Sequence, residues 1–215
     1  MIVLGLDTAV GACSAAVLAD GRPLAALSEP MTRGHQERLA SMVREAMDAA
    51  GLAFAALDRI GVTVGPGSFT GLRVGLAFAK GLALALGKPC VGVSVLDALA
   101  ASEPGGDLTL AAIDARRGQL YLQAFIDGRA VMAPDALPVE TAAARTAEFA
   151  SAGRTTIVGS GAPLLAGLIA GARIVDRAAP DPVALARLAM NRAPGPARPL
   201  YLRAPDAKLP GGLNP

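Results

Sequence analysis

The stretch Gly65-Pro-Gly-Ser-Phe-Thr-Gly-Leu-Arg-Val-Gly-Leu-Ala-Phe-Ala-Lys-Gly-Leu-Ala-Leu-Ala-Leu86 carries most of the structural information in the chain. The preceding residues 59–64, Arg-Ile-Gly-Val-Thr-Val, form a strand-like run, and the Gly-Pro-Gly that follows them predicts a turn. Ser68 and Thr70 are then suitable N-caps for a long apolar helix. The pattern therefore predicts a strand, a tight turn and a helix in direct succession.

Small residues recur at every fourth position of this helix and its end: Gly71, Gly75, Ala79, Ala83 and Gly87. Residues four apart share one face of a helix, and each glycine inside a helix costs about 0.5–1 kcal/mol relative to alanine. We expect a face with so little side-chain volume to be packed closely against the chain's own sheet, a partner protein or a membrane. A membrane is disfavoured, because Arg73 and Lys80 leave the run short of the roughly 20 apolar residues of a span.

The composition describes a folded chain without a strong electrostatic bias. Its 215 residues are 53% hydrophobic and 18% charged, which excludes general disorder and allows one large domain or two small ones. The 20 basic and 18 acidic residues give a net charge of +2, too small to indicate a dedicated nucleic-acid-binding protein. Only 3% of the residues are aromatic, so platforms for stacking bases are scarce.

The cysteine and histidine content narrows the chemistry. Cys13 and Cys90 lie in apolar runs, and we expect both to be reduced thiols in a cytoplasmic protein. The first residues contain no basic segment of the kind that begins a signal peptide, which leads to the same expectation. His35 is the single histidine, so this chain supplies no metal site that needs two imidazoles, which argues against a metallopeptidase.

The chain contains an internal repeat. Residues 3–21 align without a gap on residues 110–128, at an offset of 107 residues. In this alignment Asp7 meets Asp114, and each copy continues with a short turn, a second strand and an Asp-Gly hairpin signal. We therefore expect two similar halves, residues 1–102 and residues 103–215, the second with an irregular tail.

The period of the apolar residues predicts the elements of each half. In the first half, besides the helix described above, we expect a helix over residues 35–50 and strands over residues 2–6, 12–19, 23–28, 59–64 and 90–93. In the second half we expect strands over residues 108–113, 119–126 and 155–158, and helices over residues 141–152, 164–169 and 183–191. Two such halves, each a mixed sheet flanked by helices, predict an α/β protein of the duplicated actin-like, ribonuclease-H-like (ASKHA) class.

ATPases and sugar kinases of this class bind nucleotide phosphates between two strand–carboxylate–turn elements. Asp7 with Thr8, and Asp114, occupy these places, and two converging carboxylates can hold Mg²⁺ on phosphates. The turns argue against a working site, because Ala9 and Arg116 stand where a glycine usually lets backbone N–H groups approach phosphate. We expect a vestigial cleft with weak affinity for ATP or ADP at most, and an actin-like ATPase or small-molecule kinase is the alternative function.

Five groups of residues form a recognisable set: Asp7-Thr-Ala with Ala12-Cys-Ser14, His35 with Arg38-Leu39, the glycine-rich stretch from Gly65 to Leu82, Ile113-Asp-Ala-Arg116 with Gly118 and Tyr121, and Pro199-Leu-Tyr-Leu-Arg203. Together they resemble the TsaB (YeaZ) family, bacterial proteins needed for threonylcarbamoyl-adenosine modification of tRNA. The glycine-rich stretch is the most specific of the five. The resemblance covers most of the first half and part of the second, and little of it extends over residues 132–196.

The resemblance implies a non-catalytic scaffold subunit, with no catalytic residue, metal or cofactor of its own. In the family, TsaB pairs with the metal-binding enzyme TsaD to form N6-threonylcarbamoyladenosine in tRNAs that read ANN codons. TsaD holds its metal with a pair of histidines that TsaB-type chains lack, and the single histidine here agrees. The resemblance also implies that the ATPase TsaE joins the complex and that tRNA meets the chain through the complex. It further implies a cytoplasmic location and a homodimer when the chain is alone.

The family pairs TsaB with TsaD through N-terminal helices. For this chain the resemblance therefore implies an interface on the two helices expected in the first half. The candidate interface residues are Leu39, Met42, Val43, Met47, Gly71, Arg73, Gly75 and Ala79.

Overall fold

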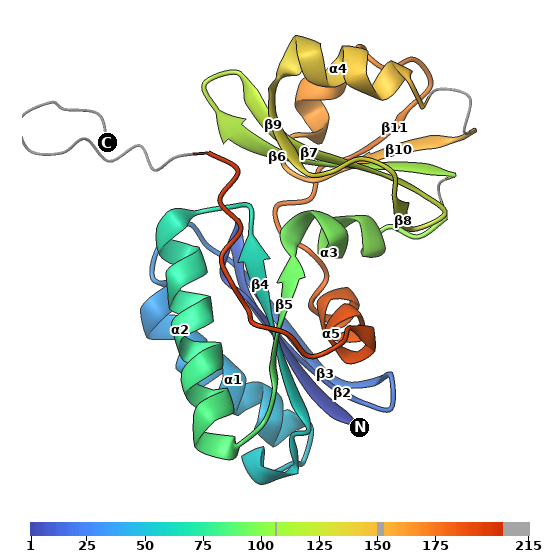
Figure 1. Cartoon of the computed structure of the whole chain (residues 1–215). Helices are drawn as coiled ribbons and strands as arrows, with labels where there is room; N and C mark the ends of the chain where they lie inside the picture. The colour runs from blue at the N-terminus through green and yellow to red at the C-terminus, as the bar shows by residue number, and fades with distance from the viewer. Residues whose placement is uncertain (106, 150–152, 204–215) are drawn as a thin grey trace, which may run out of the picture.

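The computed structural model describes residues 1–105, 107–149 and 153–203, which fold around two sheets (Figure 1). The strands of the first sheet are β1 (Ile2–Asp7), β2 (Ala12–Ala19), β3 (Arg22–Pro30), β4 (Arg59–Gly65) and β5 (Cys90–Ser94). The second sheet contains β6 (Leu108–Arg116), β7 (Gln119–Ile126), β8 (Arg129–Ala130), β9 (Asp135–Pro138), β10 (Thr155–Val158) and β11 (Arg173–Val175). The helices are α1 (His35–Ala49), α2 (Phe69–Leu86), α3 (Val95–Ala101), α4 (Val139–Ala147) and α5 (Pro182–Asn191), with short 3₁₀ helices η1 (Phe54–Ala56) and η3 (Ala162–Leu165).

Both sheets repeat one core arrangement, as the internal repeat predicts. The strand orders are β3-β2-β1-β4-β5 and β11-β10-β6-β7-β8, with β9 also paired to β7. β1 runs antiparallel to β2 and parallel to β4, as β6 does with β7 and β10. The hairpin turns match as well, because Asp20 and Asp127 have φ angles of 48° and 49° and each precedes a glycine with positive φ. The predicted class, two mixed sheets flanked by helices, is confirmed.

Most of the predicted elements are present with ends shifted by a few residues. The helix expected over residues 141–152 begins at Val139 and ends at Ala147, and residues 150–152 of that prediction lie outside the described residues. The helix expected over residues 164–169 is the short η3. The sequence analysis missed α3, β8, β9 and β11, because elements of two to seven residues contain too few positions to show a period.

The last helix does not stay with the second half, so the predicted division after residue 102 is wrong for the end of the chain. α5 packs on the face of the first sheet opposite α1 and α2 (Figure 1). A Cβ at Gly5 would lie 2.8 Å from the Cβ of Ala186, and one at Gly61 would overlap the Cβ of Ala189. Glycines in the interior of two neighbouring strands therefore make the room for this helix.

Residues 192–203, which we call the strap, continue from α5 along the first half (red in Figure 1). The N–H of Leu200 donates a 2.7 Å hydrogen bond to the carbonyl oxygen of Val64 at the end of β4. The Arg203 Nη1 donates a 2.9 Å hydrogen bond to the carbonyl oxygen of Ala115, in the second half. The strap thus begins in the first half and ends against the adjoining ends of β6 and β7 in the second half.

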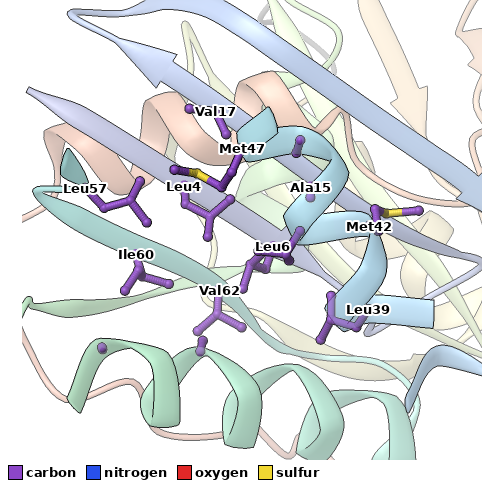
Figure 2. Packing of buried hydrophobic residues seen from close by; sticks show 14 of the residues in the cluster. Leu4, Leu6, Ala15, Val17, Leu39, Met42, Met47, Leu57, Ile60 and Val62 are labelled. Atoms are coloured by element: carbon purple, nitrogen blue, oxygen red, sulfur yellow. The ribbon is translucent and has the colours of Figure 1, made fainter. Parts of the chain in front are cut away.

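The largest cluster of buried side chains lies between the first sheet and helices α1 and α2 (Figure 2). β1 and β4 contribute Leu4, Leu6, Ile60 and Val62 from one face of the sheet. Burial of each such side chain stabilises the fold by about 1.5–3 kcal/mol. The helices supply the opposite wall of this core, mostly from α1: Leu39, Met42, Val43, Ala46, Met47, Leu76, Ala79 and Ala83.

Seven of the eight predicted interface residues belong to the interior of the chain, so their assignment to a partner contact is wrong. They are buried against the first sheet or the loop that follows β1: Leu39, Met42, Val43, Met47, Gly71, Gly75 and Ala79. Arg73 alone is exposed. The error has a simple cause, because an apolar period identifies the buried face of a helix but not what buries it.

The stripe of small residues on α2 packs against the loop after β1, so of the three possible contacts the internal one is observed. A Cβ at Gly71 would overlap the carbonyl oxygen of Thr8, and one at Gly75 would lie 2.5 Å from the Thr8 Oγ1. The Thr8 hydroxyl donates a 2.8 Å hydrogen bond to the carbonyl oxygen of Gly71. Ser68 caps the helix as predicted, accepting a 3.3 Å hydrogen bond from the Gly71 N–H.

By length and composition alone, α2 is long and apolar enough to cross a membrane, and it is the one such helix among the described residues. One of its faces lies on the chain's own sheet, with Leu72, Leu76 and Ala83 buried. This burial is the arrangement expected of a helix that covers the core of a folded domain.

Two glycines of the same helix provide a matched test of the contact with Thr8. Gly71→Ala would place a methyl group against the backbone of the loop, and we expect it to destabilise the protein by about 1–3 kcal/mol. Gly81→Ala lies where nothing is within 4 Å, and we expect it to stabilise the protein by about 0.5–1 kcal/mol. Urea unfolding followed by circular dichroism measures both changes. Equal stability of the two variants would contradict the close contact.

Candidate functional site

Asp7 ends β1 and is buried inside the first half. Its Oδ1 accepts hydrogen bonds from the Thr63 hydroxyl (2.6 Å) and from the N–H of Ala9 (2.9 Å). Its Oδ2 has no hydrogen-bond partner among the described residues. Burial raises the pKa of the Asp7 carboxyl above its ordinary value, against the opposing effect of the two hydrogen bonds. The chain therefore encloses this carboxyl.

The loop that follows Asp7 has its backbone groups engaged by the chain itself. The N–H of Ala9 bonds to Asp7, and the N–H of Gly11 donates a 3.0 Å hydrogen bond to the carbonyl oxygen of Ala178. The N–H of Ser68 donates a 2.7 Å hydrogen bond to the carbonyl oxygen of Ala9. Phosphate-binding loops need free backbone N–H groups, and two of those in this loop are already paired.

Asp114 lies near the end of β6, in the place that corresponds to Asp7, but it is only partly buried. Its Oδ1 accepts a 2.7 Å hydrogen bond from the N–H of Arg116, and its Oδ2 lies 3.2 Å from the Arg116 Nη1. Its own N–H donates a 3.2 Å hydrogen bond to the Ser160 hydroxyl. The exposed Arg116 side chain therefore neutralises the second carboxylate locally.

A cleft of about 380 Å³ lies between the two halves. Its lining includes Asp114, Ser160 and Arg203, but neither Asp7 nor Thr8. The prediction that the two repeat carboxylates converge on one cleft is therefore wrong, because the loop after β1 separates Asp7 from it. Within the described ranges, no group of three or more His, Cys, Asp or Glu residues is placed to hold a metal ion.

His35 and the two cysteines are buried or half-buried in the fold. His35 begins α1 and is buried, and its Nε2 has no hydrogen-bond partner among the described residues. Cys13 is buried and Cys90 is half-buried, and both are free thiols. Burial raises the pKa of the Cys13 thiol to about 11, which keeps it protonated at neutral pH and unreactive as a nucleophile.

A second candidate site is the face of α1 and α2 that points away from the sheet. A groove of about 550 Å³, which we call the outer groove, runs along this face. Its lining comes from both helices and is mostly apolar: Gln36, Leu39, Phe69, Thr70, Arg73, Val74, Ala77 and Phe78. Beyond the groove Gly81 is open to solvent, and Leu84 is 85% exposed. The outer face of α2 is therefore apolar although no described part of the chain covers it.

The outer groove was not predicted from the sequence, although a periodic signal for it is present on α2. Arg73, Ala77 and Gly81 are spaced by four residues, as are the buried Gly71, Gly75 and Ala79. Both sets of residues have the period of a helix. The partner contact was predicted for the set with more glycine, Gly71, Gly75 and Ala79. Two of the predicted interface residues line the outer groove, the exposed Arg73 and the almost fully buried Leu39.

Known proteins resemble this chain along most of its length. The family model described as TsaD, tRNA N6-adenosine threonylcarbamoyltransferase, matches residues 28–155, more than half of the chain. The solved structure of YeaZ from Pseudomonas aeruginosa superposes with a TM-score of 0.80 at 34% identity, over 94% of this chain and 99% of that chain. An uncharacterised protein of Mycobacterium tuberculosis is 39% identical over 211 residues, which cover 96% of this chain and 93% of the relative.

The relative with the most informative name matches a shorter segment. The tRNA threonylcarbamoyladenosine biosynthesis protein TsaB of Escherichia coli is 40% identical over 124 residues. The match covers 56% of this chain and 53% of that protein, so it spans about half the length of each.

The buried state of Asp7 predicts the effect of Asp7→Asn on stability. Because burial raises the pKa of Asp7, this group contributes stability below its unfolded pKa and loses that contribution as the pH rises through the folded pKa. At pH 7 the asparagine avoids the cost of burying a charge and keeps the acceptor oxygen. We expect a melting temperature higher by about 2–4 °C for each kcal/mol gained at pH 7, with a smaller difference at pH 4.

Differential scanning calorimetry of both proteins at the two pH values measures this effect. Glu140→Gln, which changes an exposed carboxylate on α4, is the control and should shift the melting temperature little. A lower melting temperature of Asp7→Asn at pH 7 would contradict the expected cost of burying this charge, since the fold would then depend on the ionised carboxylate.

Proposed function

We infer the function of this chain from its family, because it belongs to the TsaB (YeaZ) family of tRNA threonylcarbamoyladenosine biosynthesis proteins. Within that process we propose that it is a non-catalytic subunit that pairs with a TsaD-type transferase. The observation that carries this proposal is the contrast between its two candidate sites. Backbone groups of the loop after β1 are bonded within the chain itself. The apolar outer groove, in contrast, is not covered by any of the described residues.

The contacts around the loop after β1 support a subunit without phosphate chemistry of its own. Asp7 is buried, and the N–H groups of Ala9 and Gly11 are paired inside the chain. An actin-like ATPase needs such groups to hold phosphate and its metal ion. We therefore propose that the chain has no catalytic cofactor and that the cleft beside Asp114 binds ATP or ADP weakly at most.

The shape of the outer groove supports pairing through helices. Ala77 and Gly81 on α2 would let the backbone of a partner helix approach closely, and Val74, Phe78 and Leu84 would supply apolar area. An exposed apolar face of this kind is expected to be covered in the assembled protein. We propose that the TsaD-type partner covers it, and that a second copy of the chain covers it when the chain is alone.

The remaining members of the complex belong to the same proposal. The ATPase TsaE would join the pair, and tRNA would be bound by the complex in the cytoplasm. In this proposal the chain itself holds the TsaD-type partner in an active arrangement.

Ala77→Glu tests the partner surface. A carboxylate buried without a partner at a helix contact should weaken pairing by at least about 2 kcal/mol, a roughly 30-fold loss of affinity. Ala144→Glu changes an exposed alanine on α4 in the second half and is the matched control. Size-exclusion chromatography with light scattering, with the TsaD of the same organism, should show a one-to-one complex for the wild type and the control only.

Three results would contradict parts of this proposal. Absence of a complex between the two folded wild-type proteins, with and without ATP, would refute the pairing. Normal pairing of Ala77→Glu would refute the outer groove as its surface. Mg²⁺-dependent ATP turnover by the chain alone, lost in Asp114→Asn, would favour the actin-like ATPase or kinase instead.

A further inference from the structure

Two of the seven aromatic side chains of the chain, five Phe and two Tyr, are exposed and stacked beside the outer groove. Phe69 is the first residue of α2 and is 37% exposed, and Tyr201 lies on the strap and is 43% exposed. Their ring centroids are 5.5 Å apart, with the planes tilted by 40°. The guanidinium carbon of Arg73 lies 3.7 Å from the centroid of the Phe69 ring. We call these three residues the aromatic–arginine cluster.

Contacts of the strap residues before and after Tyr201 in the sequence hold this side chain beside Phe69. The residue before it, Leu200, donates its N–H to Val64, and Gly65 makes room there, because a Cβ at Gly65 would lie 2.6 Å from the Leu200 carbonyl oxygen. Two residues after it, Arg203 is bonded to the second half. A side chain whose backbone is already fixed loses less conformational freedom when a partner binds. Tyr201 is therefore prepared for a contact that the described chain does not make.

Arg73 adds a positive charge next to Phe69 that a partner's side chain could bind. Among the described residues it contacts the Phe69 ring and forms no salt bridge. The ring covers one side of the guanidinium and the apolar outer groove adjoins it. A guanidinium in this setting is matched by a carboxylate, which accepts two parallel hydrogen bonds from it. Tyrosine and arginine are also among the residues that contribute most to protein–protein affinity.

The surroundings favour a protein over a nucleic acid as the binding partner. The adjoining groove of about 550 Å³ is lined mainly by apolar side chains, with Arg73 as its charged residue. Binding of single-stranded RNA relies on a row of cations along the phosphate backbone. An amphipathic helix with one carboxylate fits a groove of this composition better.

We propose that the aromatic–arginine cluster anchors the partner interface, with the strap contributing Tyr201 to the surface that binds the TsaD-type partner. The partner presents a carboxylate to Arg73 and an apolar side chain to the rings of Phe69 and Tyr201. This inference rests on the proposed function and extends it, because it adds a segment from the end of the chain to a surface built from α1 and α2.

Isothermal titration of the full chain with the purified TsaD of the same organism tests the proposal. We expect Tyr201→Ala to weaken the affinity by about 10- to 30-fold, and Tyr201→Phe, which keeps the ring, to stay within about threefold of the wild type. Leu168→Ala, which removes an exposed apolar side chain in the second half, is the matched control and should bind as the wild type does. Unchanged melting temperatures show that the variants are folded.

A second variant tests the charge independently of the strap. Arg73→Gln should weaken the affinity about 10-fold at low salt, and the affinity of this variant should change less than that of the wild type between 50 and 500 mM NaCl, because a surface ion pair is screened by salt. An unchanged salt dependence would overturn the carboxylate contact. This variant also keeps the proposal testable if Tyr201→Ala fails to fold.

The outcomes separate this inference from the function on which it rests. Tight binding by both Tyr201→Ala and Arg73→Gln, together with loss of binding in Ala77→Glu, would overturn the inference and leave the proposed pairing intact. Absence of binding by the wild type would overturn both. Binding of a tRNA transcript by the chain alone, lost in Tyr201→Ala, would overturn the protein contact in favour of an RNA surface.

Discussion

The contact between α2 and the loop after β1 positions both candidate sites. Gly71 and Gly75 bring the helix so close to Thr8 that a methyl group would overlap the loop at Gly71. The same contact holds the loop over Asp7, so that the carboxyl is enclosed and the nearby N–H of Ala9 is used internally. It also sets the rotation of α2 about its axis, which leaves the row of Arg73, Ala77 and Gly81 facing outward. This one steric constraint therefore encloses Asp7 and leaves the outer groove exposed.

Local features of the sequence predicted most of the fold. The strand, turn and helix around residues 59–86, the Ser68 cap and the two Asp-Gly hairpins depend on neighbouring residues, and each is present in the structure. The internal repeat is also confirmed, because β2 and β7 begin and end at positions that differ by 107 residues. These features could be predicted because turn chemistry and the alternation of apolar residues act over a few positions.

The features that sequence analysis missed depend on contacts between distant residues. Gly5 and Gly61 each interrupt a strand, which is a sign of close backbone approach, but only the fold identifies α5 as the element that approaches them. Likewise the apolar period of α1 showed that Leu39 and Met42 would be buried, not that the chain's own sheet would bury them. The burial of Asp7 has no signal in the sequence, because an exposed catalytic carboxylate and an enclosed one have the same neighbours.

The environments of the two repeat carboxylates support the proposed binding role. An ionised carboxyl is costly to bury unless donors bond to both of its oxygens. In Asp7 only Oδ1 accepts hydrogen bonds, from Thr63 and Ala9. Asp114 is instead paired with its own neighbour Arg116. With Asp7 enclosed and Asp114 paired with Arg116, neither of the two repeat carboxylates is a free acidic group of the kind that holds a metal ion on phosphates. Among the described residues, the apolar face of α2 with Arg73 at its edge is exposed, and the proposed pairing would use this surface.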